Sequence, residues 1–434
     1  MKDINIKKYF KLAQKNYLCN TSYPLSVENW NNFKTRQFDL FKEEKNLSFY
    51  IHIPFCIKLC SFCEYVKYPI KNSDVQKKYI NILKKDIINF INEHNNITLY
   101  GFDIGGGTPT ALSNDNFIDL MDIYSFVIKK CNLINDFEPS IEATFETLTS
   151  TKIKLIKSAG IDRISLGLQT TNSRILKNNN RNNDSLNKMY DVLKDAKKNG
   201  INKINIDLMY GLKGQSKKDL KDTLKTIKYL NPEQITLYEM RYNMVSKATI
   251  DKNKMYKFYK YIYKKLINMG YHASFGQNTF SKDNKDKGLS SYLRYRMIYN
   301  VSYKGFGISA QSKSKKGISY NIGKSKKSLN ECLIKDSFEN GDIYFLDKQE
   351  ILAKYIAISL YYGNFNLDIM NEILNLNALE YFKYEFKFLK SKKIIKIKDN
   401  NVSLTKKGFK YYGAVGALFY SDNVKEWILK NEYN

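Results

Sequence analysis

The sequence predicts an α/β fold: a partial (β/α) barrel of the TIM type, with an N-terminal extension and a C-terminal winged-helix-like α+β module. Three observations lead to this fold class. Short apolar strands alternate with longer helical stretches between residues 47 and 280. Polar residues follow several of these strands, and the chain beyond residue 346 is typical of helices followed by a hairpin. Strand–helix alternation predicts a parallel sheet with right-handed crossovers.

Length and charge bound the classes of function. The chain has 434 residues and a formal net charge of +28. Its lysines are spread along the whole chain rather than gathered in a basic-aromatic module, so we do not expect a nucleic-acid partner. No apolar run is long enough for a membrane span, and the start, Met1–Lys2–Asp3, lacks the apolar region of a secretory signal. We therefore expect a cytoplasmic protein that does not span a membrane.

The elements are expected in the following order. Residues 1–46 form an N-terminal extension with one amphipathic helix near residues 6–15. The barrel then occupies residues 47–280, with helical spacing at 75–93, 185–198 and 217–230. Its expected strands are residues 49–53, 98–104, 140–143, 163–168, 203–209 and 234–240.

The rest of the chain divides in two. Residues 281–345 are expected to connect the barrel to a module at residues 346–434. Alternating residues on both sides of Asp399–Asn400–Asn401 predict a hairpin in that module. Helices with a hairpin resemble a winged helix, which can bind DNA or cover the mouth of the barrel.

A cysteine loop is the most informative local feature. Cys56, Cys60 and Cys63 have the spacing C-x3-C-x2-C directly after the first strand. A structural zinc ion takes four protein ligands, and a typical ferredoxin cluster takes four cysteines. Three cysteines favour instead a [4Fe-4S] cluster with one iron left free to bind another ligand.

Three other interpretations of the loop stay open. The cysteines could be buried thiols, because free Cys packs as a small hydrophobe. A zinc site could use His52 as its fourth ligand, since Tyr50, His52 and Pro54 share one face of the strand. Disulfide bonds are disfavoured by a reducing compartment and by the scattered positions of the other cysteines.

Polar residues near the ends of the other expected strands point to the same edge of the barrel. In a (β/α) barrel, catalytic groups lie at the carboxyl ends of the strands. A glycine run at 105–107 follows the second strand and either lets backbone N–H groups approach a carboxylate or holds an amino group by carbonyls. The other strand-end residues are Glu142, Gln169, Asp207, Tyr238 and Glu239.

These features together resemble a known family. The segments that carry the resemblance are YIHIPFC at 50–56, GGGTP at 105–109, IE at 141–142, RISLGLQ at 163–169 and NIDLMYGL at 205–212. In order and spacing they are similar to the oxygen-independent coproporphyrinogen III oxidase-like branch of the radical S-adenosylmethionine (SAM) proteins, over about residues 47–312. That branch contains the oxidase, heme chaperones, anaerobic heme-degrading enzymes, and class C radical SAM methyltransferases and cyclopropane-forming enzymes.

The resemblance assigns roles to individual residues. It implies that Cys56, Cys60 and Cys63 hold the cluster, that Phe62 borders the adenine and that Tyr50 lies near the sulfonium. It implies that the glycine loop contacts the SAM amino group. The residues implied as SAM contacts are Tyr50, Phe62, Gly105, Gly106, Gly107, Thr108, Glu142, Gln169, Arg181 and Asp207.

The cofactors and partners follow from the same resemblance. It implies a [4Fe-4S] cluster and SAM, and two SAM molecules in many members. The segment from Gly305 to Gln311 resembles the region near the second SAM. The reduced cluster splits SAM into methionine and a 5′-deoxyadenosyl radical, so a one-electron donor such as flavodoxin or ferredoxin is implied, with a small-molecule substrate.

Four departures from the family pattern weigh on the reaction. The oxidase has a further cysteine two positions after the third ligand, where this chain has Tyr65. Heme chaperones begin almost at the cluster strand, whereas here about 46 residues precede it. The usual Gly-Leu-Pro is replaced by a sequence that ends in Lys213, and Arg241 stands where the oxidase has a small residue near the second SAM.

The sequence therefore favours a radical SAM enzyme that methylates or cyclopropanates an unsaturated or heteroaromatic carbon with two SAM molecules. The alternative is a porphyrin- or heme-pathway enzyme, or a heme chaperone without catalysis. In this family the C-terminal module covers the barrel, which favours a cover over DNA binding. The identity of the substrate is not encoded in these motifs.

Overall fold

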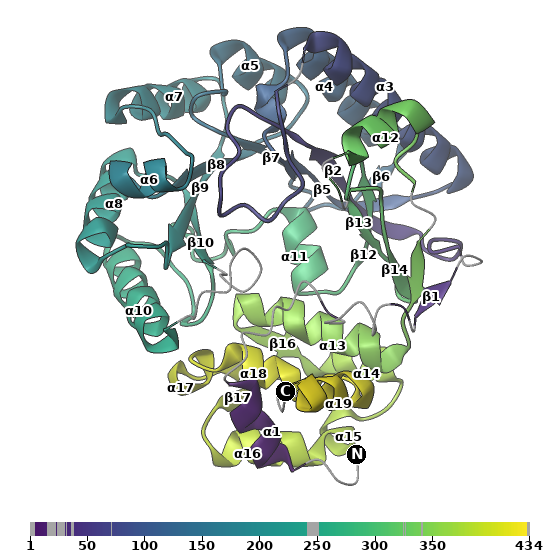
Figure 1. The fold of residues 1–434 in the computed structure, drawn as a ribbon, viewed down its shortest axis with the longest axis vertical. Coiled ribbons are helices and arrows are strands. Elements are labelled where there is room, and N and C mark those ends of the chain that lie inside the picture. The colour runs from purple at the N-terminus through teal and green to yellow at the C-terminus, as the bar shows by residue number, and fades with distance from the viewer. Residues whose placement is uncertain are drawn as a thin grey trace.

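The protein is an open, curved sheet with helices on its outer face and a second module across its open side (Figure 1). The main sheet runs in the order β1-β15-β14-β13-β12-β2-β5-β7-β8-β9-β10-β11, so it ends in free edges and does not close. This confirms the predicted partial barrel. The computed structural model describes residues 5–14, 23, 31, 33–35, 39–70, 72–240, 251–323, 325, 327–339 and 342–431.

Parallel strands form the centre of the sheet, as the sequence predicts. Each expected strand is present, and the second is longer than expected because it includes two glycines of the 105–107 run. The last ends one residue earlier than expected, at Glu239. The strands are β2 (Asn46–Ile53), β5 (Thr98–Gly106), β7 (Ser140–Ala143), β8 (Arg163–Gln169), β9 (Lys203–Tyr210) and β10 (Gln234–Glu239).

The segment expected to be a connection supplies further strands to the same sheet. β12 (Ser302–Phe306) pairs in parallel with β2, on the side opposite β5. Its neighbours are antiparallel, so they extend the sheet without crossover helices. These neighbours are β13 (Gln311–Lys313), β14 (Gly317–Tyr320), β15 (Ile343–Phe345) and β1 (Lys34–Thr35), and β11 (Thr279–Ser281) borders β10 at the other edge.

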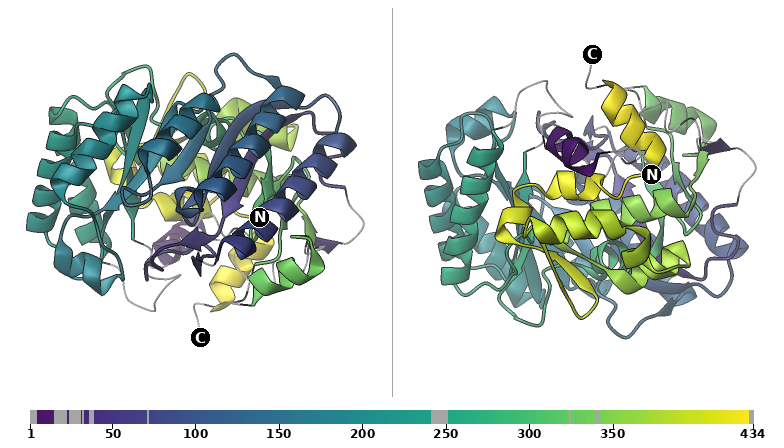
Figure 2. Two further views of the ribbon diagram at one scale, coloured as in Figure 1. Left: turned by 90° about the horizontal axis from the view of Figure 1, so that it is seen from above. Right: turned by 90° about the horizontal axis from the view of Figure 1, so that it is seen from below.

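Crossover helices cover the outer face of the sheet (Figures 1 and 2). Several begin at a side-chain cap that satisfies a free backbone N–H, such as Asn72, Ser113 and the capping box of Ser216 with Asp219. The crossover helices are α3 (Ser73–Glu93), α4 (Asn114–Lys130), α5 (Ser150–Ser158), α6 (Ser173–Asn178), α7 (Leu186–Lys198) and α8 (Lys217–Leu230). Two further helices, α10 (Lys252–Asn268) and α12 (Ser328–Lys335), connect antiparallel strands.

The strands are polar on their concave face along most of their length. In β8, Ile164, Leu166 and Leu168 are fully buried in the hydrophobic core, while the residues between them alternate to the other face. On that face Arg163 donates from Nε to Gln234 (2.8 Å) and from Nη1 to Ser140 (2.7 Å). We call the space enclosed by this face the barrel lumen.

A short helix, α11 (Ser291–Met297), lies inside the arc of the sheet (Figure 1). It approaches β5 so closely that a Cβ on Gly101 would stand 2.2 Å from the backbone nitrogen of Tyr292. Ser290, which caps the helix, also donates a hydrogen bond of 2.7 Å to Asp103 in β5. The lumen is thus partly filled from within by this helix.

The C-terminal module combines helices with a small antiparallel sheet. The expected hairpin is present: Lys398 pairs with Asn401, and Asp399 and Asn400 take the positive φ angles of a tight turn. The elements are α13 (Lys348–Ser359), β16 (Asn364–Asn366), α14 (Leu367–Leu374), α15 (Ala378–Tyr381), α16 (Lys383–Ser391), β17 (Ile395–Lys398), β18 (Asn401–Leu404), α17 (Lys406–Phe409), α18 (Tyr412–Ala417) and α19 (Asp422–Asn431). The winged-helix description and the proposed boundary at residue 346 stay interpretations.

The N-terminal helix packs into this module rather than onto the barrel. Helix α1 (Ile6–Ala13) lies at the start of the predicted segment, and its Tyr9, Phe10 and Ala13 are buried in the core of the C-terminal module. Tyr23 is fully buried in the same core. In Figure 1 the first and last described helices, α1 and α19, accordingly both lie at this module.

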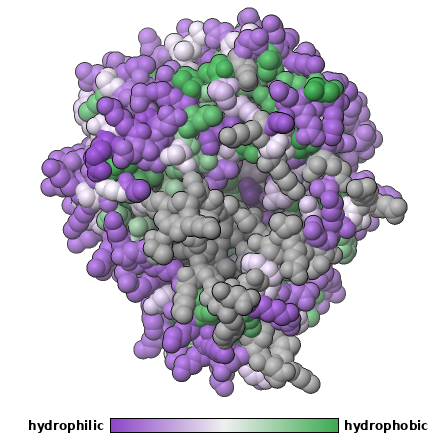
Figure 3. Space-filling view, viewed as in Figure 1, coloured by the Kyte–Doolittle hydropathy of each residue, from purple (hydrophilic) through white to green (hydrophobic). Residues whose placement is uncertain are grey.

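The described surface is largely hydrophilic, in line with the many charged residues of the sequence. On the face shown in Figure 3, hydrophilic residues cover much of the described surface, with hydrophobic patches between them. Among the described helices, none has the length and apolar character needed to cross a bilayer.

Candidate functional site: a cysteine loop at the barrel mouth

The cysteine loop leaves the barrel at the carboxyl end of β2. Its base is closed by the short parallel pair β3 (Phe55–Cys56) and β4 (Tyr68–Pro69). His52, still in β2, lies 2.8 Å through its Nε2 from the carbonyl of Val66, at the far end of the loop. The loop is therefore tied at both ends to the strand that precedes it.

Three thiols are gathered in this loop. Cys56 and Cys60 are buried and Cys63 is half-buried, and Thr108 Oγ1 lies 3.7 Å from the Cys56 sulfur. Burial raises the pKa of the Cys56 thiol to about 11 and also raises the pKa of Cys63. Metal binding releases the thiol protons, because the deprotonated thiolate is the form that coordinates a metal.

Positive charge lies beside the thiols. Arg181 Nη1 is 3.6 Å from the Cys60 sulfur, and Lys67 donates a hydrogen bond of 2.7 Å to the Cys63 carbonyl. Both cations suit the negative charge of thiolates bound to a cluster. Among the described residues, no three or more His, Cys, Asp or Glu side chains are arranged around a single metal ion. Three cysteine thiols beside these cations fit a multi-iron cluster, whose cysteines bind different irons.

The zinc interpretation loses its fourth ligand. His52 is 3 % exposed, its Nε2 faces the Val66 carbonyl and its Nδ1 lies 3.4 Å from the Tyr50 hydroxyl. Burial lowers the pKa of His52 to about 4, so the ring is neutral. A neutral ring with Nε2 at a carbonyl donates there, and His52 anchors the loop instead of completing a tetrahedral site.

The glycine run is shaped by its own neighbours. A Cβ on Gly105 would lie 2.6 Å from the Glu142 carboxyl carbon, and a Cβ on Gly106, whose φ is +111°, would lie 2.5 Å from the His52 ring. Two of the three N–H groups are already used: Gly106 donates to Glu142 (3.1 Å), and Gly107 to the Ile53 carbonyl (2.8 Å). This favours carbonyl contacts to an amino group over carboxylate capture, and both modes stay predictions.

Carboxylates lie beside this run on the lumen side. Burial raises the pKa of Glu142 to about 8, with the nearby Asp207 as the next cause. Burial likewise raises the pKa of Asp207 to about 6, against hydrogen bonds from Asn205 (2.8 Å) and Ser165 (3.2 Å). A cationic ligand such as an ammonium or sulfonium group would lower both pKa values and hold the carboxylates ionised.

Two of the expected contact residues hold unused polar atoms. Gln169 ends β8 with a φ of +66°, and its buried Oε1 finds no hydrogen-bond partner among the described residues. The buried Nε of Arg181 likewise finds no partner among the described residues, whereas Nη2 of the same side chain donates to the Gly167 carbonyl. Strained backbone and unsatisfied polar atoms together are typical of a ligand site.

The remaining expected residues are placed as follows. Tyr50 faces the lumen and stacks on Tyr292, with ring centroids 5.7 Å apart. Phe62 packs against a small apolar cluster that includes Met240 and Leu212. Thr108 is buried beside Cys56, and Arg241 lies outside the described residues.

Sequence reasoning missed two asparagines that hold the cysteine loop from the other side. Asn179 accepts from the N–H of Ser61 (3.1 Å), and Asn180, with a φ of +49°, donates from its side chain to the Leu59 carbonyl (3.0 Å). They precede Arg181 directly. An Asn run just before a predicted ligand residue was the available signal, because Asn tolerates the left-handed conformation.

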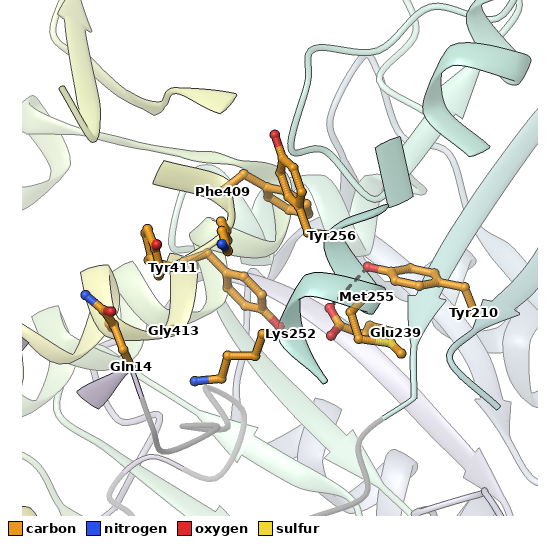
Figure 4. A pocket seen from close by; sticks show the side chains of 12 residues that line it. Gln14, Tyr210, Glu239, Lys252, Met255, Tyr256, Phe409, Tyr411 and Gly413 are labelled. Carbon is orange, nitrogen blue, oxygen red and sulfur yellow. Dashed lines mark hydrogen bonds between the residues drawn. The ribbon is translucent and has the colours of Figure 1, made fainter. Parts of the chain in front are cut away.

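A pocket lies at the carboxyl ends of β9 and β10, between the barrel and the C-terminal module (Figure 4). Tyr210 donates a hydrogen bond of 3.1 Å to Glu239 at its inner end. The other lining residues labelled in Figure 4 belong to α10, to the C-terminal cap of α1 and to the α17–α18 region. The lining residues are Gln14, Tyr210, Glu239, Lys252, Met255, Tyr256, Phe409, Lys410, Tyr411, Tyr412, Gly413 and Ala414.

Comparison with known proteins agrees with this geometry. A family model described as the radical SAM superfamily matches residues 50–227. The heme chaperone HemW of Buchnera aphidicola subsp. Acyrthosiphon pisum is 34% identical over 275 residues, which cover 60% of this chain and 67% of that protein. HemW of Bacillus subtilis is 29% identical over 326 residues, 72% of this chain and 83% of that protein.

Two further comparisons concern the oxidase. The oxygen-independent coproporphyrinogen III oxidase of Escherichia coli is 30% identical over 225 residues, 50% of this chain and 48% of that enzyme. The solved structure of coproporphyrinogen III oxidase (HemN) from Escherichia coli superposes with a TM-score of 0.72 at 21% identity, covering 87% of this chain and 91% of that one. The chain belongs to the radical SAM superfamily, in the branch that contains coproporphyrinogen III oxidase and the heme chaperones.

Proposed function

We propose that this protein binds heme and cleaves SAM at a [4Fe-4S] cluster held by Cys56, Cys60 and Cys63. The observation that carries the proposal is the gathering of three thiols, Glu142, Gln169, Arg181 and Asp207 at one end of the lumen of a chain whose relatives include heme chaperones. The cluster, when bound, supplies the electron that breaks the sulfonium bond of SAM. Catalysis of this kind belongs to the cofactor, and the protein orients and shields the reactants.

The roles of the chain's own residues follow from their positions. Arg181 can pair with the SAM carboxylate through its unused Nε while it keeps the Gly167 carbonyl. Glu142 and Asp207 face the lumen, where they can accept from ammonium or ribose hydroxyl groups. Binding of two SAM molecules stays a prediction.

The pocket between barrel and C-terminal module supports a planar ligand. Aromatic rings and aliphatic stems dominate the lining of this pocket (Figure 4). Lys252 and Lys410 also line it. Conjugated rings pack well on aromatic side chains, and heme carries carboxylates that pair with cations. None of the histidines is well placed to bind the iron: His52 and His94 direct ring nitrogens at backbone carbonyls, and the exposed His272 precedes the β11 edge.

The choice among heme-related reactions rests on Tyr65. The oxidase has a cysteine at this position, so coproporphyrinogen oxidation is disfavoured. The relatives reported above are heme chaperones and oxidases, so they support the heme alternative better than C-methylation or cyclopropanation, which the motifs alone favoured. A one-electron donor such as flavodoxin or ferredoxin is part of the proposal, because SAM cleavage consumes an electron.

The test is a parallel measurement of heme binding and SAM cleavage on the anaerobically reconstituted full-length protein. Hemin is titrated by its Soret absorbance, and 5′-deoxyadenosine is quantified after addition of SAM and dithionite. We expect saturable hemin binding near one per chain together with 5′-deoxyadenosine. The Cys60→Ser variant should lose iron and 5′-deoxyadenosine, and Cys131→Ser, away from the loop, should keep both.

Each outcome bears on the proposal. S-adenosylhomocysteine formed with 5′-deoxyadenosine, without hemin binding, would favour methyl transfer and overturn it. Loss of the Soret band during turnover would identify ring opening of the bound heme, and a stable band would identify heme carriage. A protein that binds neither iron nor hemin would refute the assignment entirely.

A further inference from the structure

An arginine in the barrel lumen has no carboxylate partner. Arg296 is on α11, the helix inside the arc of the sheet, and none of the described Asp or Glu carboxylates forms an ion pair with it within 4 Å. It donates from Nη1 to the Tyr292 hydroxyl (3.2 Å), and a hydrogen bond from Arg296 also lowers the pKa of Tyr303 against the effect of burial. Its buried Nε finds no acceptor among the described residues. A guanidinium presents five N–H donors, so most of its hydrogen-bonding capacity is unused.

Aromatic rings hold this guanidinium in place. Its central carbon lies 4.7 Å from the ring centroid of Tyr303 in β12 and 5.7 Å from that of Tyr292. Tyr292 in turn stacks on Tyr50 of β2. Cation–π contacts from two nearly perpendicular tyrosine rings hold the guanidinium in the lumen.

A second cation lies in the same region. Lys313 of β13 is 3 % exposed and donates a hydrogen bond of 2.6 Å to Asn300, a neutral side chain. Burial, and next the charge of Arg296, lower the pKa of Lys313 to about 7. Two buried cations that repel each other, with no ion pair to either from a described carboxylate, favour an anion between or beside them.

The carboxylate of Asp103 in β5 does not pair with Arg296. The charge of Arg296 acts to lower the pKa of Asp103, but the hydrogen bond to this carboxylate comes from Ser290, and its buried Oδ1 finds no partner among the described residues. The lumen therefore offers an unused donor and an unused acceptor. We propose that Arg296 is a carboxylate anchor in the barrel lumen, which fixes a carboxylated ligand beside Tyr50 and the cluster loop.

Two ligands carry such a carboxylate, the heme of the proposed function and SAM, and the inference rests on the proposed function only for the first. The test compares each ligand with an analogue that lacks the charge: hemin with hemin dimethyl ester, and SAM with decarboxylated SAM. Hemin binding is followed by Soret titration and SAM binding by equilibrium dialysis, both on reconstituted full-length protein. The variants are Arg296→Gln and Arg296→Lys.

Arg294→Gln is the matched control. Arg294 lies on the same helix and pairs with Asp136 (2.9 Å), so its replacement removes the same charge at another place. We expect Arg296→Gln to weaken one carboxylate ligand about 10- to 100-fold, as for hydrogen bonds to a charged group, and to leave its uncharged analogue as in the wild type. Arg296→Lys should lose less, and Arg294→Gln should lose nothing. Iron content and circular dichroism verify that each variant is folded.

The outcomes separate the inference from the proposed function. A selective loss for hemin supports both. A selective loss for SAM in a protein that binds no hemin supports the anchor and refutes the heme proposal. Equal losses for ligand and analogue mean that Arg296 only supports packing, and no loss for either ligand, or a wild type that does not discriminate carboxylate from analogue, overturns the anchor.

Discussion

Single residues around the cysteine loop are constrained by packing as much as by chemistry. Gly106 combines a positive φ with a close approach to the His52 ring, and His52 in turn anchors Val66. A side chain at this position would push His52 and with it the far end of the loop. The glycine is thus required by the fold of the site even before any ligand is considered.

Gly106→Ala should therefore destabilise the protein more than Gly160→Ala. Both glycines have positive φ, but a Cβ on Gly160 meets nothing within 4 Å. The left-handed backbone costs each variant about 1 kcal/mol, and steric overlap adds roughly 1–3 kcal/mol at Gly106 alone. Urea unfolding of the two apoproteins measures the difference. Equal losses would mean that the His52 ring can move aside freely.

Asp103 makes stability depend on pH. Burial raises the pKa of Asp103 to about 7, against the Ser290 hydrogen bond and the charge of Arg163. In the unfolded chain the pKa is about 3.9, so the stability that the neutral acid contributes is complete below about pH 4 and is lost as pH rises through about 7.

Asp103→Asn keeps the acceptor and cannot ionise. Its stability relative to the wild type should increase from pH 5 to pH 8, by on the order of 1–3 kcal/mol. Thermal unfolding of the apoprotein at both pH values measures this, with the exposed Asp115→Asn as control. A constant difference across the range would show that Asp103 is ionised in the folded protein at all of these pH values.

Among single residues, the sequence predicts the site residues that belong to linear motifs. The cysteines, the glycine run and Arg181 follow from spacing and resemblance. Arg296 and Tyr292 do not, because they lie on a seven-residue helix with no periodic pattern, and only the tertiary fold turns them into the lumen. His52 was weighed as a zinc ligand for the same reason: its carbonyl partner, Val66, is a contact that spacing does not reveal.

Among the elements, helix α1 has a role that its position in the chain does not suggest. It precedes the barrel in sequence but packs against α16 and α18 of the C-terminal module. Phe10 is 5 % exposed and lies edge-on to Phe388, with ring centroids 5.2 Å apart. The N-terminal extension is in this respect a part of the C-terminal core.

Phe10→Ala should loosen the C-terminal module. Removal of a buried Phe costs about 3–5 kcal/mol, and the cost falls on the module to which α1 is attached. We expect faster proteolysis within residues 346–431, with the barrel fragment unchanged. The exposed Lys11→Ala on the same helix serves as control. Faster cleavage within the barrel instead would contradict the described packing.

Element prediction succeeds where the pattern is local. The central strands and the hairpin at Asp399 follow from alternation and turn residues. The sequence does not predict the strands after residue 300, because β12 pairs with β2, about 250 positions away along the chain. The concave polar face was visible in the alternation of β8 and β9, which buried parallel strands covered on both faces do not show.

For the whole molecule, the ring of Phe409 is one of the contacts that join the two modules. Phe409 of α17 packs on Tyr259 of α10, with centroids 4.3 Å apart, and also contacts Phe275. Gly276 has φ +104°, and a Cβ there would stand 3.2 Å from the Phe409 ring. This contact lies beside the pocket of Figure 4, so the distance between the modules and the shape of the pocket depend on it.

Phe409→Ala should loosen the contact between the modules around this ring while leaving each module folded. We expect amide exchange to increase in α10, α17 and α18, where the ring is removed, with little change in β5 and β7. Tyr384→Ala, an exposed aromatic in the same module, is the control. An increase spread evenly over the chain would indicate a general loss of stability instead.

The position of β12 beside β2 affects how the chain is made. During synthesis, the strand that leads into the cysteine loop emerges early, yet it lacks one of its two hydrogen-bonded neighbours until residues 302–306 have left the ribosome. Non-local pairing of this kind forms slowly, since a long loop must close first. The strand that leads into the cysteine loop therefore cannot gain both of its neighbours until more than two thirds of the chain has been translated.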